Sequence, residues 1–184
     1  MNILISFLLL TTLTLTSSQT LAFGDSLADI HENLKERYNI EHISNDQFTQ
    51  MAPSDTVVFD VRKPVEYAVS HIDGAIRVDP GIKPEDFFSQ YGKRLNGKTA
   101  VFYCSVGRRS SKLLSEVNDQ LPDYGAKNAY NLEGGIFKWH NDQIDLVRNE
   151  KSTRDVHPYN LYWSRLLENR SFIEYSVESD VESN

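Results

Sequence analysis

The sequence predicts an α/β domain built on a small, mostly parallel sheet of about five strands. Strand-like apolar runs alternate with helical patterns through the middle of the chain, which is typical of parallel strands connected by helices. The elements are short, and neither a G-x-G-x-x-G nor a Walker A motif is present. The sequence therefore does not favour a dinucleotide-binding domain.

The first elements each have a local cause in the sequence. Apolar residues recur at helical spacing across 26–38, behind a serine that can cap a helix. A short strand is expected near 40–43, and Ser44-Asn-Asp-Gln47 then has the form of a capping box that opens another helix. Thr56-Val-Val-Phe59 is β-branched and aromatic, which favours a buried strand.

The later elements follow the same alternation. Pro64 lies at the expected first turn of a helix, a position that tolerates proline, and Pro122 is expected to end the long helix that precedes it. The remaining predictions are a strand near 76, a helix over 84–91, a strand over 99–103, a helix over 109–121, a strand over 128–132 and a helix over 134–140.

The N-terminal residues resemble a targeting signal. Residues 3–16 form an apolar run that is too short for a comfortable membrane span, and small residues at Thr20 and Ala22 suggest cleavage near Ala22. Residues 1–22 are therefore interpreted as a signal peptide, which predicts a periplasmic or secreted protein that leaves the membrane after cleavage. The run lacks a preceding Lys or Arg, so an uncleaved N-terminal anchor is the alternative.

The rest of the chain divides into four predicted segments. A helical extension (23–37) precedes the α/β domain (38–145), and a second helical extension (146–175) follows it. The second extension contains an amphipathic helix candidate over Asn160–Asn169, with Leu161, Trp163, Leu166 and Leu167 expected to pack on the domain. Residues 176–184 are acidic and polar, which predicts a disordered tail.

Global charge excludes one class of partner. The 184 residues carry a net charge of −7, so a nucleic-acid-binding surface is not expected. Any site for an anion must therefore be local.

Cys104, the one cysteine of the sequence, lies in such a local site. It ends a predicted buried strand, where open α/β sheets place their functional residues. A loop and a helix N-terminus follow, and their backbone N–H groups can bind an anion and stabilise a thiolate. An exported protein with a single cysteine cannot form an internal disulfide, which favours a reactive thiol over an inert core residue.

Several kinds of cysteine chemistry do not fit the spacing. The phosphatase loop His-Cys-x5-Arg needs an arginine at the sixth position after the cysteine, where this chain has Ser110. Dithiol exchange needs Cys-x-x-Cys, which is absent. None of the five histidines has a spacing that pairs it with the thiol as a base or that forms a metal site. No metal and no cofactor is expected.

Four stretches resemble the rhodanese, or thiosulfate sulfurtransferase, domain family in its exported single-domain form. They occur in the order typical of the family and together span about 85 residues of the chain. The stretches are Val57-Val-Phe-Asp-Val-Arg62 with Glu66-Tyr67, Ser70-His-Ile-Asp-Gly-Ala-Ile76, Cys104-Ser-Val-Gly-Arg-Arg-Ser110, and Asn131-Leu-Glu-Gly-Gly-Ile-Phe-Lys-Trp139.

The resemblance implies a three-layer fold, with helices on both faces of the sheet, and a two-step sulfur transfer. The Cys104 thiolate would take the outer sulfur of a small anionic donor such as thiosulfate, and a thiol or cyanide would then accept it. The implied active-site loop is Ser105, Val106, Gly107, Arg108, Arg109 and Ser110, with Arg109 inside the loop and Arg108 at its rim. Asp60 and Arg62 are expected to pair locally and to organise the strand end.

A binding module without significant turnover is the alternative function. Some rhodanese-like domains serve as binding modules, and the C-terminal extension could recruit a protein partner with little turnover at Cys104.

Overall fold

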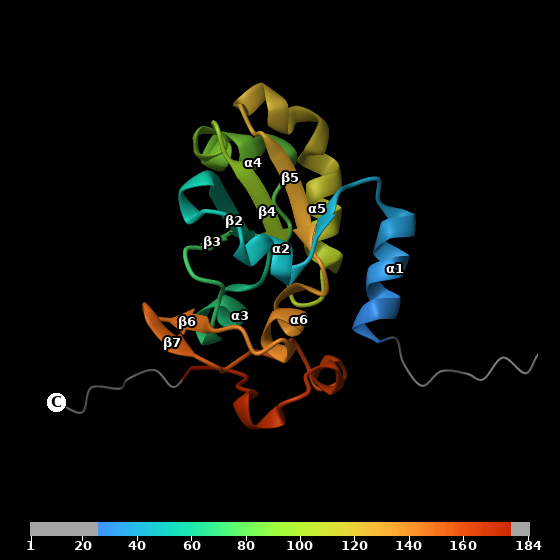
Figure 1. Ribbon diagram of the computed structural model, residues 1–184, viewed down its shortest axis with the longest axis vertical. Helices are drawn as coiled ribbons and strands as arrows, with labels where there is room; N and C mark the ends of the chain where they lie inside the picture. The colour runs from blue at the N-terminus through green and yellow to red at the C-terminus, as the bar shows by residue number, and fades with distance from the viewer. Residues whose placement is uncertain (1–25, 178–184) are drawn as a thin grey trace, which may run out of the picture.

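The computed structural model describes residues 26–177 and confirms the predicted α/β fold, with a parallel sheet between two layers of helices (Figure 1). The five strands are ordered β1-β5-β4-β2-β3, and each pairing is parallel. The strands are β1 (His42–Ile43), β2 (Thr56–Asp60), β3 (Ile76–Arg77), β4 (Thr99–Tyr103) and β5 (Asn128–Leu132).

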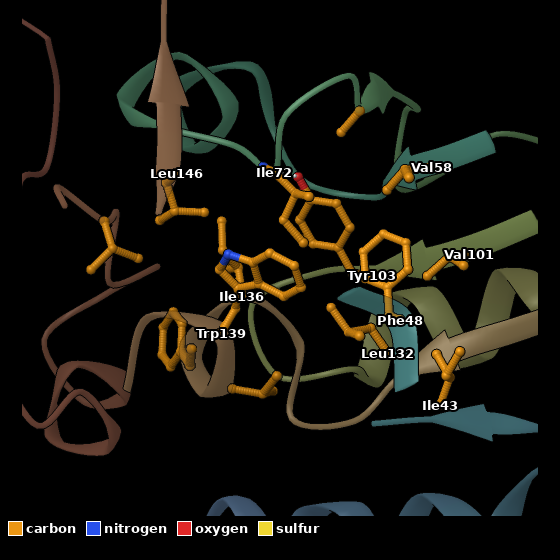
Figure 2. Close-up of a cluster of buried hydrophobic side chains, with 14 of the residues drawn as sticks. Ile43, Phe48, Val58, Ile72, Val101, Tyr103, Leu132, Ile136, Trp139 and Leu146 are labelled. Atoms are coloured by element: carbon orange, nitrogen blue, oxygen red, sulfur yellow. Dashed lines mark hydrogen bonds between the residues drawn. The ribbon is translucent and has the colours of Figure 1, made fainter. Parts of the chain in front are cut away.

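The two faces of the sheet bury separate hydrophobic cores. Successive strand residues point to opposite faces, so Val58, Val101 and Tyr103 belong to one core, shown in Figure 2, while Phe59 and Phe102 belong to the other. The first core contains residues of α1 (Leu27–Arg37), α2 (Asn45–Thr49) and α6 (Gly135–Asn141), and the second contains residues of α4 (Pro84–Tyr91) and α5 (Arg108–Val117). The predicted three-layer arrangement is therefore confirmed.

Local capping agrees with the sequence. Ser26 and Ser44 each form a capping box at the start of α1 and α2, which satisfies amides that a helix start leaves without partners. The short helix α3 (Pro64–Val69) begins at its proline as predicted. Among the described residues, no helix is long and apolar enough to cross a membrane.

The helix that follows the cysteine loop is shorter than predicted. The α-helix α5 ends at Val117, and a 3-10 helix, η3 (Asn118–Tyr124), continues through Pro122. The α-helix therefore ends before Pro122 rather than at it, and 3-10 turns carry the chain through the proline to Tyr124.

The predicted helical character of residues 146–175 is wrong. This C-terminal segment begins with an antiparallel hairpin of β6 (Leu146–Arg148) and β7 (Lys151–Thr153), and continues with two 3-10 helices, η4 (Trp163–Leu166) and η5 (Arg170–Phe172). Leu167 is buried as expected, whereas Leu161 is 79% exposed. Figure 1 shows the segment, in orange and red, beyond the carboxyl ends of the strands, beside α3 and α6.

Two predicted segments fall largely or wholly outside the described residues. These are the signal peptide (1–22) and the acidic tail (176–184), of which only Ser176 and Val177 are described.

Candidate active site

Cys104 directly follows β4, and its side chain is buried at 1% exposure. The loop after it turns at Gly107, whose φ of 90° is a conformation that side chains resist. A Cβ at Gly107 would also lie 3.3 Å from Leu34 of α1 and 3.2 Å from Asn131 of β5. The loop is therefore packed tightly against the N-terminal helix and the neighbouring strand.

The N-terminus of α6 fixes the direction of the loop's peptide groups. The amide of Ile136 donates to the Cys104 carbonyl at 2.9 Å, and the amide of Phe137 donates to the Ser105 carbonyl at 3.0 Å. In a trans peptide the N–H points opposite to the C=O, so the amides of Ser105 and Val106 point away from α6. No other described residue accepts a hydrogen bond from these two amides, and they are free to bind an anion or a charged sulfur.

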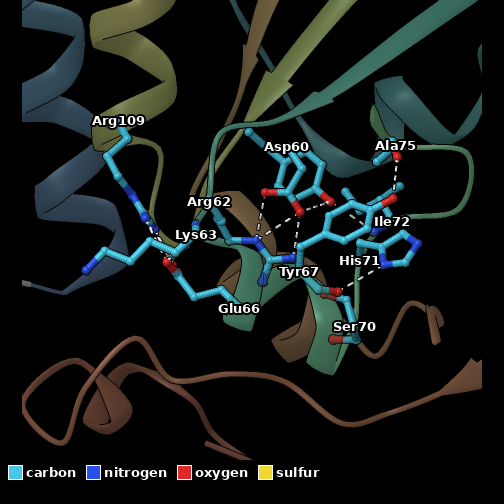
Figure 3. A network of polar contacts seen from close by, with 12 residues as sticks. Asp60, Arg62, Lys63, Glu66, Tyr67, Ser70, His71, Ile72, Ala75 and Arg109 are labelled. Carbon is cyan, nitrogen blue, oxygen red and sulfur yellow. Dashed lines mark hydrogen bonds and ion pairs between the residues drawn. The ribbon is translucent and has the colours of Figure 1, made fainter. Parts of the chain in front are cut away.

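A buried carboxylate organises the loop from the other side. Glu66 of α3 is 1% exposed and accepts hydrogen bonds from Ser105 Oγ at 2.9 Å, from both terminal nitrogens of Arg109 at 2.8 Å, and from the Lys63 amide at 3.1 Å. Figure 3 shows this pairing of Glu66 with Arg109. The arrangement fixes Arg109 at the start of α5, beside the thiol.

The charges of this group reinforce one another. Burial would raise the pKa of Glu66, but the hydrogen bonds and charge of Arg109 outweigh it and lower that pKa to about 2. Burial would likewise lower the pKa of Arg109, whereas the hydrogen bonds that it donates to Glu66 and the negative charge available at Cys104 and Glu66 raise it. Arg109 therefore stays cationic beside a sulfur atom that can carry negative charge.

The Glu66 carboxylate should make stability depend on acid pH. Its folded pKa of about 2 lies below its ordinary value of 4.5, so its contribution is present above pH 4.5 and is lost as the pH falls to about 2. We expect about 3 kcal/mol of unfolding free energy to disappear over this window. In urea unfolding at a series of pH values, Glu66→Gln should be less stable near neutrality and should lose less stability on acidification. Parallel curves for the two proteins would contradict this assignment.

A second buried network joins the ends of β2 and β4 (Figure 3). The guanidinium of Arg62 donates to both carboxylate oxygens of Asp60, at 2.6 and 2.8 Å, and the Tyr103 hydroxyl donates to the same carboxylate at 2.7 Å. All three side chains are fully buried. The Tyr103 hydroxyl also accepts from the amide of Ile72 at 3.1 Å. Asp60 and Arg62 thus pair locally and hold the strand ends behind the loop.

A cavity of about 150 Å³ opens over the thiol. Cys104 and four residues of the predicted loop line it, together with two aromatic side chains of the C-terminal segment, Tyr159 and Trp163. The four loop residues are Ser105, Val106, Arg108 and Arg109.

The other predicted site residues brace this cavity from behind. Ser110 Oγ donates to Asn131 Oδ1 at 2.6 Å and to the Gly107 carbonyl at 3.1 Å. Neither Ser110 nor Gly107 lines the cavity, and neither Asp60 nor Arg62 does.

None of the five histidines, all of which lie within the described residues, lines the cavity. The ring of His71 stacks on Tyr67 at 3.8 Å, and its backbone bridges to Val147 of β6. Among residues 26–177, no group of three or more His, Cys, Asp or Glu side chains is arranged to hold a metal ion.

Comparison with known protein families identifies the domain that contains this site. The family model described as a rhodanese-like domain matches residues 44–142, which is more than half of the chain. The chain belongs to the rhodanese-like domain family. The match contains the cysteine loop, Glu66 and the Asp60–Arg62 pair, but not α1 or the C-terminal segment.

The curated relatives match about half of this chain and a smaller share of their own length. A tRNA uridine(34) hydroxylase of Bacillus velezensis is 32% identical over 99 residues, which covers 53% of this chain and 30% of that protein. A probable adenylyltransferase/sulfurtransferase of Mycobacterium tuberculosis is 35% identical over 94 residues, covering 49% of this chain and 22% of that protein. The chain thus spans less than a third of either relative.

One solved structure illustrates the shared fold of the rhodanese-like domain. A thiosulfate sulfurtransferase from Pseudomonas aeruginosa aligns with a TM-score of 0.51 at 17% identity, over 66% of this chain and 23% of that chain. At this identity the likeness concerns the fold alone.

Three residues of the site were not among the predicted site residues. Glu66 belongs to the first of the four stretches that resemble the rhodanese family, so its spacing from Arg62 is a usable signal. Tyr159 and Trp163 lie outside the rhodanese-like domain match, and the sequence predicts only packing on the domain for Trp163. No local pattern pointed to their position over the thiol.

Proposed function

We propose that this protein is a sulfurtransferase that carries sulfane sulfur as a persulfide on Cys104. The donor is a small anion such as thiosulfate, and the acceptor is a thiol or cyanide. Membership of the rhodanese-like domain family supports sulfur-transfer chemistry in general. The observation that supports this particular reaction is the placement of the thiol at a small cavity lined by two arginines.

The first step forms the persulfide. The Cys104 thiolate attacks the outer sulfur of thiosulfate, a new S–S bond forms, and the old S–S bond breaks so that sulfite leaves with its electron pair. Arg108 and Arg109 attract the anion, and Arg109 stabilises charge beside the thiol. The outward-facing amides of Ser105 and Val106 stabilise the charged persulfide without having to reorganise.

The second step returns the enzyme to its starting state. A thiolate or cyanide attacks the outer sulfur of the persulfide, and the Cys104 thiolate leaves. Glu66 stays ionised throughout and keeps Arg109 and Ser105 in place, so it acts as a positioning residue. The two steps need no external oxidant or reductant.

Loading with sulfur tests this proposal. After incubation with thiosulfate, intact-mass measurement should find one added sulfur atom per chain, and cyanide should remove that atom as thiocyanate. Cys104→Ser should show neither reaction, while urea unfolding confirms that the variant is folded. If wild-type protein gains no sulfur and forms no thiocyanate, the enzymatic function is excluded and a binding module is left as the alternative.

We also propose that the protein acts outside the cytoplasm. The support is the apolar run of residues 3–16 followed by small residues near Ala22. N-terminal sequencing of protein from the native cell should find a chain that begins near residue 23. A chain that retains residues 1–22 would contradict cleavage.

A further inference from the structure

The C-terminal segment crosses the mouth of the Cys104 cavity and is fastened on both sides of it. Before the crossing, Val156 is fully buried and the Asp155 carbonyl accepts from Ser70 Oγ at 2.6 Å. After it, Leu167 is 2% exposed and the Leu166 carbonyl accepts from Asn141 Nδ2 at 2.9 Å. Residues 157–166 therefore form a fixed wall over the loop.

Two rings of this wall contact the arginines of the loop. The Tyr159 ring lies 5.1 Å from the guanidinium carbon of Arg109, and the Trp163 ring lies 5.2 Å from that of Arg108. Contacts of this kind attract a cation to the face of a ring. Each ring therefore positions one arginine of the loop while it lines one side of the cavity.

The backbone at Tyr159 supports a dedicated role for its ring. Its φ of 65° is in the left-handed region, which costs a non-glycine residue about 1–2 kcal/mol. The Tyr159 amide donates to Nδ1 of His157 at 2.9 Å. His157 is buried, and burial lowers its pKa, so its ring stays neutral and can accept this bond. The strained turn directs the ring over Arg109.

We propose that Tyr159 and Trp163 determine specificity, by restricting Cys104 to small sulfur donors and acceptors and excluding bulky thiols. This inference rests on the proposed function for its substrate class, because the molecules selected are those that exchange sulfur with the cysteine. Tyr159 and Trp163 lie outside residues 44–142, so the restriction belongs to this chain's own C-terminal segment rather than to the matched domain.

Alkylation of Cys104 tests the wall without any sulfur transfer. Iodoacetamide and iodoacetamide linked to fluorescein share one reactive group and differ in bulk, and Cys104 is the one cysteine they can label. Wild-type protein should react much faster with the small reagent. In Tyr159→Ala and in Trp163→Ala, the ratio of the small-reagent to the bulky-reagent rate constant should fall at least about tenfold.

Two controls separate the rings from general loosening of the segment. Tyr159→Phe retains the ring and should keep the wild-type ratio. Leu161→Ala removes an apolar side chain of the same segment that is 79% exposed and does not line the cavity, and it should also keep that ratio. If Trp163→Ala fails to fold, the Tyr159→Ala and Tyr159→Phe pair decides, because Tyr159 is 39% exposed and outside the buried cores.

Discharge of the persulfide gives the second readout. Loaded Tyr159→Ala should transfer sulfur to glutathione about tenfold faster, relative to cyanide, than loaded wild-type protein. An unchanged alkylation ratio in both alanine variants would overturn the specificity role even if wild-type protein loads sulfur normally. Failure of wild-type protein to load sulfur would instead overturn the proposed function, and the alkylation ratio would still report whether the rings restrict access.

Discussion

Replacing Gly135 with alanine should disrupt the contact between α6 and the cysteine loop. Gly135 has a φ of 57°, and a Cβ there would lie well inside van der Waals distance of the Cys104 carbonyl oxygen and 2.8 Å from the Ser105 oxygen. These atoms are backbone and cannot swing aside, so the loop itself has to move. The move would break the hydrogen bonds from the Ile136 and Phe137 amides.

The variant should lose both stability and reactivity. We expect the free energy of unfolding to fall by about 1–3 kcal/mol for overpacking, in addition to the cost of the left-handed conformation. The rate of sulfur loading from thiosulfate should fall about a hundredfold, because the thiol and the loop amides no longer share one geometry. Urea unfolding and intact-mass kinetics measure the two effects.

Gly74→Ala is the matched control for this prediction. Gly74 has a φ of 70°, and an added Cβ would have no atom within 4 Å, so the variant bears the conformational cost alone. It should load sulfur at the wild-type rate. Equal destabilisation and equal loading rates in the two variants would show that the close approach of α6 to the loop is unimportant.

Removing the charge of Asp60 should have a comparably large effect on stability. Arg62 is fully buried, and although burial lowers its pKa, the charge and hydrogen bonds of Asp60 raise it. Asp60→Asn would leave a buried guanidinium without its counter-charge, which typically costs about 3–5 kcal/mol. Burial and the charge of Asp60 also raise the pKa of Tyr103, so its hydroxyl keeps the proton that it donates to Asp60.

Glu116→Gln provides the comparison on the surface. Glu116 pairs with Lys112 one helical turn earlier, and both side chains are well exposed, so the same change of carboxylate to amide should cost about 0.5 kcal/mol or less. Equilibrium urea unfolding of both variants measures the difference. If Asp60→Asn cost no more than Glu116→Gln, the buried pair would contribute no more to stability than a solvent-exposed one.

The central strands were predictable to within one residue because their causes are local. The runs over 56–59 and 99–103 are apolar on both faces, and the structure buries both faces under helices. Serine caps and an N1 proline likewise act within one turn, and the helices α1, α2 and α3 begin where these signals predicted.

The C-terminal segment was not predictable because distant residues decide its backbone. The helical spacing of Leu161, Leu166 and Leu167 was real, but Asn141 of α6 occupies the backbone groups that a helix would use. Its Nδ2 donates to the Leu166 carbonyl, and its Oδ1 accepts from the Glu168 amide at 3.1 Å. These bonds end the 3-10 turn and direct Leu167 into the core, so tertiary contact overrides local propensity.

The residues of the active site show the same difference between local and long-range causes. The position of Cys104 after a buried strand and the pairing of Asp60 with Arg62 followed from near neighbours in the sequence. The rings of Tyr159 and Trp163 reach the loop only through the fold of a segment far along the chain. Spacing within the motif could not reveal them.

The wall over the cavity also means that access to Cys104 changes while the chain is being made and folded. A chain is made from its N-terminus, so Cys104 leaves the ribosome well before residues 157–166 exist. Until Val156 and Leu167 dock, Tyr159 and Trp163 do not line the cavity that contains the thiol. Access to the cysteine is therefore restricted only after the C-terminal segment has been made and has packed in place.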